Sequence, residues 1–268
     1  MHDKEMLKKM IQELMELNSV HSPIPRDEES MVMMLKDLMT LSRPGELSQE
    51  YYQGEEVFLE TEKKNQTIIS ADDIDDELMP SIFLYQGDIT LIKADAIVNA
   101  ANEKLLGCFI PGHHCIDNAI HLAAGLQLRN ECYRLMQLQG QDEKTGQAKV
   151  TPAYNLPSDY VIHTVGPNLH GPKELSDDDL EVELAACYQS VFEAIKPYKA
   201  IETVVFCSIS TGVYGVPIAL ASRVALRSIR RYLAEHDHHI KKVIIDCFSE
   251  EDYHEYEKQA RIINEGHC

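Results

Sequence analysis

The chain has 268 residues, which is enough for one large domain or for a medium domain with a helical appendage. Hydrophobic residues make up 44% and charged residues 26% of it, so a fibrous or wholly disordered protein is excluded. Asp and Glu number 44 against 25 Lys and Arg, which gives a formal net charge of -19. This charge opposes a large electrostatic footprint on DNA, RNA or anionic lipid, so we expect no nucleic acid and no membrane as a partner.

The cysteine content and the first ten residues indicate the compartment. There are seven cysteines, an odd number, and residues 1–10 are charged and amphipathic where a secretory signal needs an apolar run. We therefore expect a reducing, cytoplasmic environment. The longest stretch without a formal charge, residues 203–222, contains Gly212, Gly215 and Pro217. We interpret it as a strand, a loop and the start of a helix rather than as a membrane span.

Residues 1–80 are predicted to form an N-terminal helical extension with an acidic joint. Eight of the ten methionines fall within the first 41 residues. The pattern predicts amphipathic helices over residues 3–18 and 27–41, the second ended by Arg43-Pro44-Gly45. Methionine-rich helix faces are typical of adaptable packing against a neighbouring domain, with a partner-binding groove as the alternative. The carboxylates of residues 70–77 predict a solvated joint.

Residues 81–268 are predicted to form one α/β domain, because short β-rich runs alternate with helical patterns there. The predicted strands span residues 82–86, 96–99, 149–154, 160–165, 203–208 and 243–248, and the predicted helices span residues 116–138, 177–196, 217–235 and 250–264. This alternation favours a mostly parallel central sheet covered by helices on both faces. Such sheets bind ligands at the carboxyl ends of their strands, so the loops there are the candidate functional segments.

Three strand ends lead into loops whose residues suit a ligand. Asp88 follows Gly87 after the first strand, where a turn or helix-cap role is the alternative to ligand binding. Asn99 and Asn102 flank two alanines, and their amides suit sugar hydroxyls. Residues 208–217 can aim successive backbone N–H groups and a helix N-terminus at one anion. This loop predicts a phosphate cradle without the lysine of a P-loop, with a tight, empty turn as the alternative.

A fourth segment carries two thiols and two imidazoles close together: Cys108, His113, His114 and Cys115. Their softness and spacing suit Zn²⁺. Only three of the four readily converge, and three protein ligands would leave a coordination position open for water or substrate. The alternatives are a coincidence of free thiols or a structural site completed by a distant residue. Asp117 and His121, four residues apart, are predicted to share one helix face beside this segment.

Taken together and in this order, the loops resemble the macrodomain family of ADP-ribose-binding and ADP-ribosyl-hydrolysing proteins. The resemblance covers residues 81 to about 262 and rests on Gly87-Asp88-Ile89-Thr90, Asn99-Ala100-Ala101-Asn102, Asp117-Asn118-Ala119-Ile120-His121-Leu122-Ala123-Ala124-Gly125, Val161-Ile162-His163-Thr164-Val165-Gly166-Pro167 and Ser210-Thr211-Gly212-Val213-Tyr214-Gly215. It implies a three-layer α/β/α sandwich with a mixed central sheet.

The segment before Asp117 is similar to that of the zinc-containing macrodomain subgroup, whose pattern is Gly-Cys-Phe-x-Pro-x-His-x-Cys-Ile-Asp-Asn. On this pattern Cys108, His113 and Cys115 are the Zn²⁺ ligands, and His114 is a bystander. The subgroup also carries an N-terminal helical extension. In bacteria it is similar in context to proteins encoded beside a sirtuin-type ADP-ribosyltransferase and a lipoyl-carrier relative of the glycine-cleavage H protein. The resemblance implies removal of ADP-ribose from a modified protein, with that carrier as the candidate target.

The resemblance also implies a role for individual residues. Asp88, followed by Ile89, would accept a hydrogen bond from the adenine amino group, and Phe248 would face the adenine ring. Asn102 would hold the distal ribose, and Asp117 falls at the position of the catalytic aspartate. The pyrophosphate would be wrapped by Ser210, Thr211, Gly212, Val213 and Tyr214.

The expected activity is zinc-assisted hydrolysis of the bond between C1 of the distal ribose and a side chain of a mono-ADP-ribosylated protein. Asp117 would activate a water or stabilise the cationic ring, Asn102 would complete the catalytic site, and Zn²⁺ would position or polarise a ribose hydroxyl or a water. Three alternatives stay open: a non-catalytic reader of ADP-ribose with a structural zinc, a structural zinc protein whose N-terminal helices recruit partners, and an esterase acting on acetylated ADP-ribose.

Overall fold

The computed structural model describes residues 1–172 and 174–266. The described residues form a seven-stranded sheet in the order β2-β3-β9-β8-β5-β7-β6. The outer pairs β2–β3 and β6–β7 are antiparallel, and all other neighbours are parallel. The strands are β2 (Glu77–Met79), β3 (Ile82–Gln86), β5 (Ala96–Ala101), β6 (Ala148–Pro152), β7 (Tyr160–Val165), β8 (Thr203–Cys207) and β9 (Lys242–Cys247), with a separate short pair β1 (Ile69–Ser70) and β4 (Ile92–Lys93).

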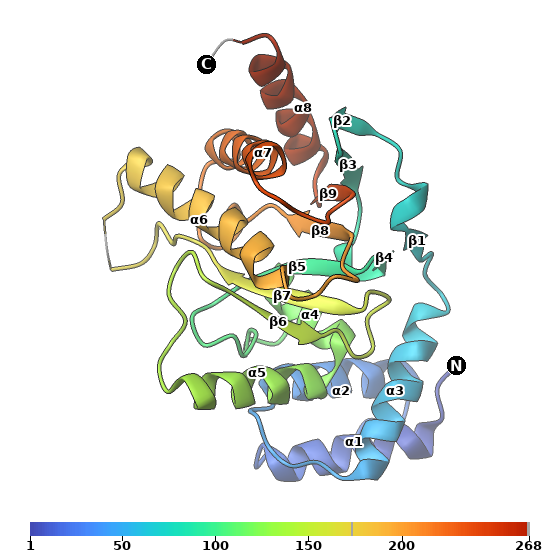
Figure 1. The fold of residues 1–268 in the computed structure, drawn as a ribbon. Coiled ribbons are helices and arrows are strands. Elements are labelled where there is room, and N and C mark those ends of the chain that lie inside the picture. Colours follow the sequence, from blue (N-terminus) through green and yellow to red (C-terminus); the bar gives the residue numbers. More distant parts are fainter. Residues whose placement is uncertain (173, 267–268) are drawn as a thin grey trace.

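Helices cover both faces of this sheet (Figure 1). One face packs against α6 (Asp177–Ile195), α7 (Ile218–Glu235) and α8 (Glu250–Asn264), and the other packs against α4 (Ile116–Ala124) and α5 (Leu126–Gln139). The central strands read as nearly continuous apolar runs because both of their faces are buried. The predicted three-layer α/β/α sandwich with a mixed central sheet is confirmed.

The N-terminal extension is a bundle of three helices packed against the α4–α5 side of the domain (Figure 1): α1 (Lys4–Leu17), α2 (Glu28–Leu41) and α3 (Gln49–Lys63). The first two were predicted; the third was missed because its apolar positions are interrupted by Gly54 and by several glutamates. Met10, Met31 and Met39 are buried in a cluster that includes Leu126 of α5. For these methionines the packing interpretation is confirmed, since their faces meet one another and the neighbouring domain.

The predicted helix over residues 116–138 is two helices, which corrects the sequence-based expectation. The break is at Gly125, whose φ of 88° is in a region that residues with a Cβ rarely adopt. A Cβ there would lie 2.5 Å from Oε2 of Glu55, a buried residue of α3. The break therefore lets the N-terminal extension approach the start of α5.

The acidic joint is only partly solvated. Its carboxylate-bearing residues are exposed, but Ala71 and Ile74 between them are buried against the α4–α5 side of the sheet. The last residue of the run, Glu77, begins strand β2. The segment is thus an anchored connection that enters the sheet at its edge.

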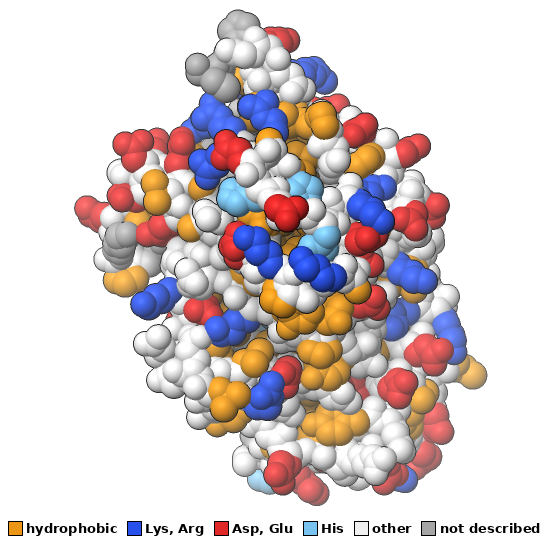
Figure 2. All heavy atoms as spheres, in the orientation of Figure 1, with side chains coloured by type: hydrophobic (Ala, Val, Ile, Leu, Met, Phe, Trp, Pro, Cys, Tyr) orange, Lys and Arg blue, Asp and Glu red, His pale blue; other side chains and the backbone are white. Residues whose placement is uncertain are grey.

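The surface agrees with the composition. On the face drawn in Figure 2, acidic side chains are spread over the whole outline and basic ones are interspersed among them. No helix among residues 1–172 and 174–266 is both long enough and apolar enough to cross a membrane.

Candidate active site

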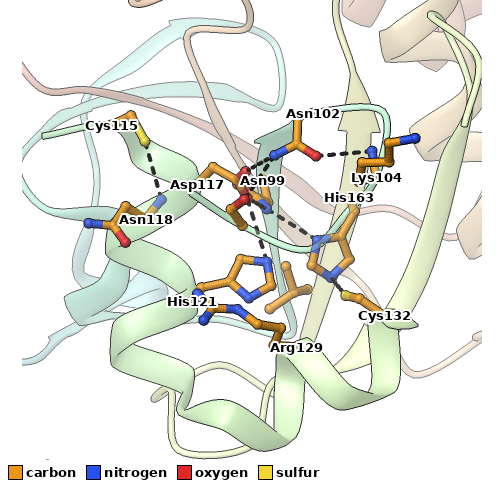
Figure 3. Close-up of polar contacts among 12 residues, drawn as sticks. Asn99, Asn102, Lys104, Cys115, Asp117, Asn118, His121, Arg129, Cys132 and His163 are labelled. Carbon is orange, nitrogen blue, oxygen red and sulfur yellow. Dashed lines mark hydrogen bonds and ion pairs between the residues drawn. The ribbon is translucent and has the colours of Figure 1, made fainter. Parts of the chain in front are cut away.

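The site is centred on Asp117, which lies in the first turn of α4 (Figure 3). This turn lies next to the carboxyl end of β5. Asn99, on β5, donates from Nδ2 to Asp117 Oδ1 at 2.8 Å. Asn102, just past the end of the strand, donates from Nδ2 to Asp117 Oδ2 at 3.1 Å. Each carboxylate oxygen therefore has its own amide donor, and this fixes the orientation of the side chain.

Burial controls the chemistry of this carboxyl group. Asp117 is 6% exposed, and removal from water raises its pKa to about 6, against the opposing effect of the Asn99 hydrogen bond. His121, predicted to share its helix face, does so, with Nε2 3.6 Å from Asp117 Oδ1. Burial lowers the pKa of His121 well below its ordinary value, so this imidazole is neutral. Asp117 is thus a buried carboxylate that can accept a proton close to neutral pH.

His163 lies behind Asn99 and sets the direction of its amide. Asn99 Nδ2 lies 3.1 Å from His163 Nδ1, and His163 Nε2 lies 3.0 Å from Thr151 Oγ1. Because the amide nitrogen is a donor, Nδ1 accepts and the ring proton is on Nε2. His163 is therefore a buried histidine whose two ring nitrogens both have partners. Sequence reasoning missed the contact of Asn99 with Asp117; its signal was an amide in an otherwise apolar, buried strand.

The three predicted metal ligands converge. The donor atoms of Cys108, His113 and Cys115 all lie within 4.8 Å of one another, with Cys108 Sγ 3.4 Å from His113 Nδ1. Ligands of a tetrahedral zinc ion lie about 3.4–3.8 Å apart, given Zn–ligand distances of about 2.0–2.3 Å. His114 is exposed and outside this group. Two soft thiol sulfurs and one imidazole, each half-buried, therefore fit Zn²⁺ with one position left open.

A backbone N–H group approaches each of the two sulfurs. The N–H of Ile110 points at Cys108 Sγ, and the N–H of Asn118 points at Cys115 Sγ, each at 3.4 Å. Cys115 is the N-cap of α4, where the helix dipole favours an anion. In the absence of a cation, however, burial and the nearby Cys108 thiol raise the pKa of Cys115 to about 12. A bound cation is what would make both thiolates favourable here.

A second group of metal-ligand side chains, His121, Cys132 and His163, also lies within 4.8 Å and is fully buried. Both ring nitrogens of His163 already have partners in Asn99 and Thr151. The Arg129 guanidinium adds a positive charge that disfavours a cation near His121. We interpret this group as the polar support of Asp117.

The predicted phosphate cradle leaves β8 and leads into α7. Ser210 has a φ of 67° and Gly215 a φ of 74°, so the loop makes two left-handed turns. It closes on itself through the Val216 N–H, which donates to Ser210 O at 3.0 Å. Across the described ranges, the N–H groups of residues 211–214 have no backbone acceptor. A Cβ added at Gly212 would meet nothing within 4 Å, so the loop is open at this residue.

The predicted adenine residues lie at the carboxyl ends of the adjacent strands β3 and β9. Asp88 caps the short 3-10 helix η2 (Ile89–Leu91), and its Oδ1 accepts from the backbone N–H and the hydroxyl of Thr90. Ile89 is buried, whereas Phe248 is 85% exposed and free to cover a planar ring. Asp246, to which sequence reasoning gave no role, is buried beside them. Burial, and to a smaller extent the negative charge of Asp88, raises the pKa of Asp246 well above its ordinary value.

The sandwich and the loops at the carboxyl ends of its parallel strands define an α/β ligand-binding domain. Residues 98–225 match the model of the Macro domain family. The chain is 38% identical over 242 residues to a protein of Treponema medium named protein-ADP-ribose hydrolase, a match that covers 88% of this chain and 89% of that one. A protein of the same name from Staphylococcus aureus (strain MSSA476) is 36% identical over 236 residues, covering 88% of this chain and 86% of that one.

Solved structures show the same likeness. A Trypanosoma brucei macrodomain in complex with ADP-ribose is 30% identical and has a TM-score of 0.61, covering 83% of this chain and 94% of that one. The chain therefore belongs to the macrodomain family.

Proposed function

We propose that this protein removes ADP-ribose from mono-ADP-ribosylated protein side chains. The two relatives described above are named protein-ADP-ribose hydrolases. The observation that carries the proposal is the position of Asp117: its carboxylate is oriented by two amides and lies two residues from the N-cap of α4, which is itself one of three convergent soft donors.

Binding of ADP-ribose follows the strand ends. Asp88 and Ile89 would hold the adenine and Phe248 would cover its ring. The pyrophosphate would accept hydrogen bonds from the N–H groups of residues 211–214. Residues 208–217 contain no lysine. Backbone N–H donors suit this loop because they can bind an anion without one. The distal ribose would then lie near Asn102 and Asp117.

The reaction replaces the bond between ribose C1 and the side chain by a bond to water oxygen. Charge with oxocarbenium character develops on the ring, and the departing side chain would take up the proton that Asp117 removes from the attacking water. Asp117 would accept the proton of the attacking water and stabilise the cationic ring. Asn102 links this carboxylate to residues 107–115, the metal-ligand segment. Its Nδ2 donates both to Asp117 Oδ2 at 3.1 Å and to Gly107 O at 3.0 Å.

We propose that Cys108, His113 and Cys115 hold Zn²⁺ and place the chain in the zinc-containing macrodomain subgroup. When bound, the metal supplies Lewis acidity and an open coordination position for a ribose hydroxyl or a water. Two thiolates neutralise most of its charge, so substrate positioning is favoured over generation of a free hydroxide. The proposed target is a lipoyl-carrier relative of the glycine-cleavage H protein, in the reducing cytoplasm.

The test is release of ADP-ribose from a mono-ADP-ribosylated lipoyl-carrier protein by wild type and by Asp117→Ala. We expect turnover by the wild type and loss of turnover, with retained ADP-ribose binding, in the variant. Binding without turnover in both proteins would instead support the alternative, a reader module with a structural zinc.

A further inference from the structure

Phe109, which directly follows the first metal-ligand residue, lies between two guanidinium groups. Arg43 Cζ and Arg129 Cζ are each 4.9 Å from the centre of its ring. Arg43 belongs to the segment that joins α2 to α3 in the N-terminal extension, whereas Arg129 is in α5 of the macrodomain. Guanidinium groups at this distance are attracted to the face of an aromatic ring. The ring therefore connects the two parts of the chain at the start of the metal-ligand segment.

The Arg129 side of this contact is fixed by the extension. Arg129 is 2% exposed, and its Nη1 donates to the carbonyls of Met39, Thr40 and Ser42 at 2.7, 3.2 and 2.5 Å. These carbonyls end helix α2, where no later N–H of the helix can reach them. The C-terminus of α2 thus holds a buried cation in place against Phe109.

The Arg43 side is fixed by the macrodomain in return. Asn130, the residue after Arg129, donates from Nδ2 to Gly45 O at 3.0 Å, and its Oδ1 accepts from Gly45 N at 3.1 Å. The backbone is therefore held on both sides of Arg43, at Ser42 and at Gly45. Although the side chain of Arg43 is exposed, its origin is well defined.

The far end of the metal-ligand segment has different supports. Cys115 is fixed as the N-cap of α4, and Asn118 Nδ2 donates to His113 O at 3.0 Å. Between the two ends, Ile110 to Gly112 are exposed. Cys108 must meet the other two donors across this exposed turn, so its position depends on Gly107, which Asn102 holds, and on Phe109.

We propose that Phe109, held by Arg43 and Arg129, is a positioning residue through which the N-terminal extension sets the metal affinity of the Cys108, His113 and Cys115 site. This inference rests on the zinc site of the proposed function. It gives the extension a role in metal binding, because Arg43 and the α2 carbonyls that hold Arg129 fix the Phe109 ring next to Cys108 and so keep Cys108 within reach of His113.

The experiment measures Co²⁺ and Zn²⁺ affinity of the full chain by thiolate-to-Co²⁺ absorption and by competition with a chromogenic chelator. We expect Phe109→Ala, which loses both cation–π contacts, to bind metal about tenfold more weakly, and Arg43→Ala, which loses one exposed contact, to bind it about two- to fivefold more weakly. The double variant should bind no more weakly than Phe109→Ala alone, because the Arg43 contact is already lost. Arg26→Ala, which removes another arginine on the exposed surface of the extension, is the matched control and should bind metal as the wild type does.

Circular dichroism establishes that each variant is folded, and Arg43→Ala provides the test even where Phe109→Ala does not fold. Wild-type affinity in Arg43→Ala, or independent and additive losses in the double variant, would overturn the proposal. Failure of the wild type to bind either metal would overturn the zinc site itself. Metal binding without hydrolysis leaves the inference standing while removing the proposed activity, so the two failures are distinguishable.

Discussion

Asp117 and the metal-ligand segment are neighbours, but the protein holds them in different ways. The carboxylate is buried and has two amide donors, one of which is backed by His163 and Thr151. The three candidate metal ligands are half-exposed, and the contacts of their sulfurs are longer: 3.4 Å to the N–H groups of Ile110 and Asn118 and, for Cys108, 3.4 Å to His113 Nδ1. The orientation of the Asp117 carboxylate is therefore fixed by short hydrogen bonds, whereas the thiol–imidazole group is held by longer contacts and is a candidate Zn²⁺ site. Changes at Asp117 should accordingly act on chemistry, and changes at the loop should act through metal.

The largest effect is expected from Asp117→Ala. We expect turnover to fall about 10²- to 10⁴-fold, the range for loss of a positioned acid or base. ADP-ribose affinity should change little, because the cradle of residues 210–214 is untouched. Initial rates on modified protein and calorimetric titration of ADP-ribose measure the two quantities. Asp117→Asn, which keeps the shape and loses the charge, should be as inactive; activity in that variant would show that the carboxylate has no chemical role.

The loop is tested by His113→Ala with His114→Ala as its matched control. Loss of His113 should release the metal and lower turnover about 100-fold, while the fold persists because the loop is peripheral to the core. The exposed His114 should be replaceable without effect on either. Metal content by mass spectrometry and turnover of each variant provide the readouts. Equal turnover of the metal-free and metal-loaded wild type would remove zinc from the mechanism.

Glu55 extends the comparison, since it is a second buried carboxyl group close to α4 and α5. Its Oε1 accepts from Leu126 N at 3.0 Å and from Tyr51 OH at 3.2 Å, but among residues 1–172 and 174–266 its Oε2 is buried without a hydrogen-bond partner. Burial raises the pKa of Glu55 to about 7. The folded state thus prefers the protonated form, so its contribution to the free energy of unfolding is complete below the ordinary pKa and is lost as the pH rises through about 7.

Glu55→Gln should remove this contribution, which is on the order of 2 kcal/mol across that range. Urea unfolding of wild type and variant between pH 5 and 8 measures it. Parallel pH profiles for the two proteins would show that burial does not raise the pKa of Glu55 in the folded state.

The smallest effect is expected at the adenine end. Asp88→Asn should raise KM about tenfold, as for loss of one hydrogen bond to a charged group, and leave kcat unchanged. Steady-state kinetics with the modified protein separates the two parameters. A fall in kcat with an unchanged KM would place Asp88 in the chemistry instead of in binding.

Local patterns predicted the sheet and the donor set well. Strands β3 and β7 have the predicted bounds because each is a short β-rich run between polar turns. Cys108, His113 and Cys115 meet because one turn and one helix N-cap suffice to bring them together. Both kinds of prediction depend on residues that are close in sequence.

Contacts between distant residues were out of reach. The break at Gly125 makes room for Glu55, which comes from a helix far earlier in the chain. The amide of Asn99 is set by His163 and the ring of Phe109 by Arg43, and neither partner lies in the same local motif. These contacts are set by tertiary packing, and of the three only Asn99 has a local signal, as an amide inside an apolar strand.

A crystal structure of the ADP-ribose complex, with anomalous scattering recorded at the zinc absorption edge, tests the central claim most directly. The account predicts zinc on Cys108, His113 and Cys115 and the distal ribose between the metal and Asp117, with the pyrophosphate on the N–H groups of residues 211–214. A metal bound elsewhere, or a ribose turned away from Asp117, would contradict it.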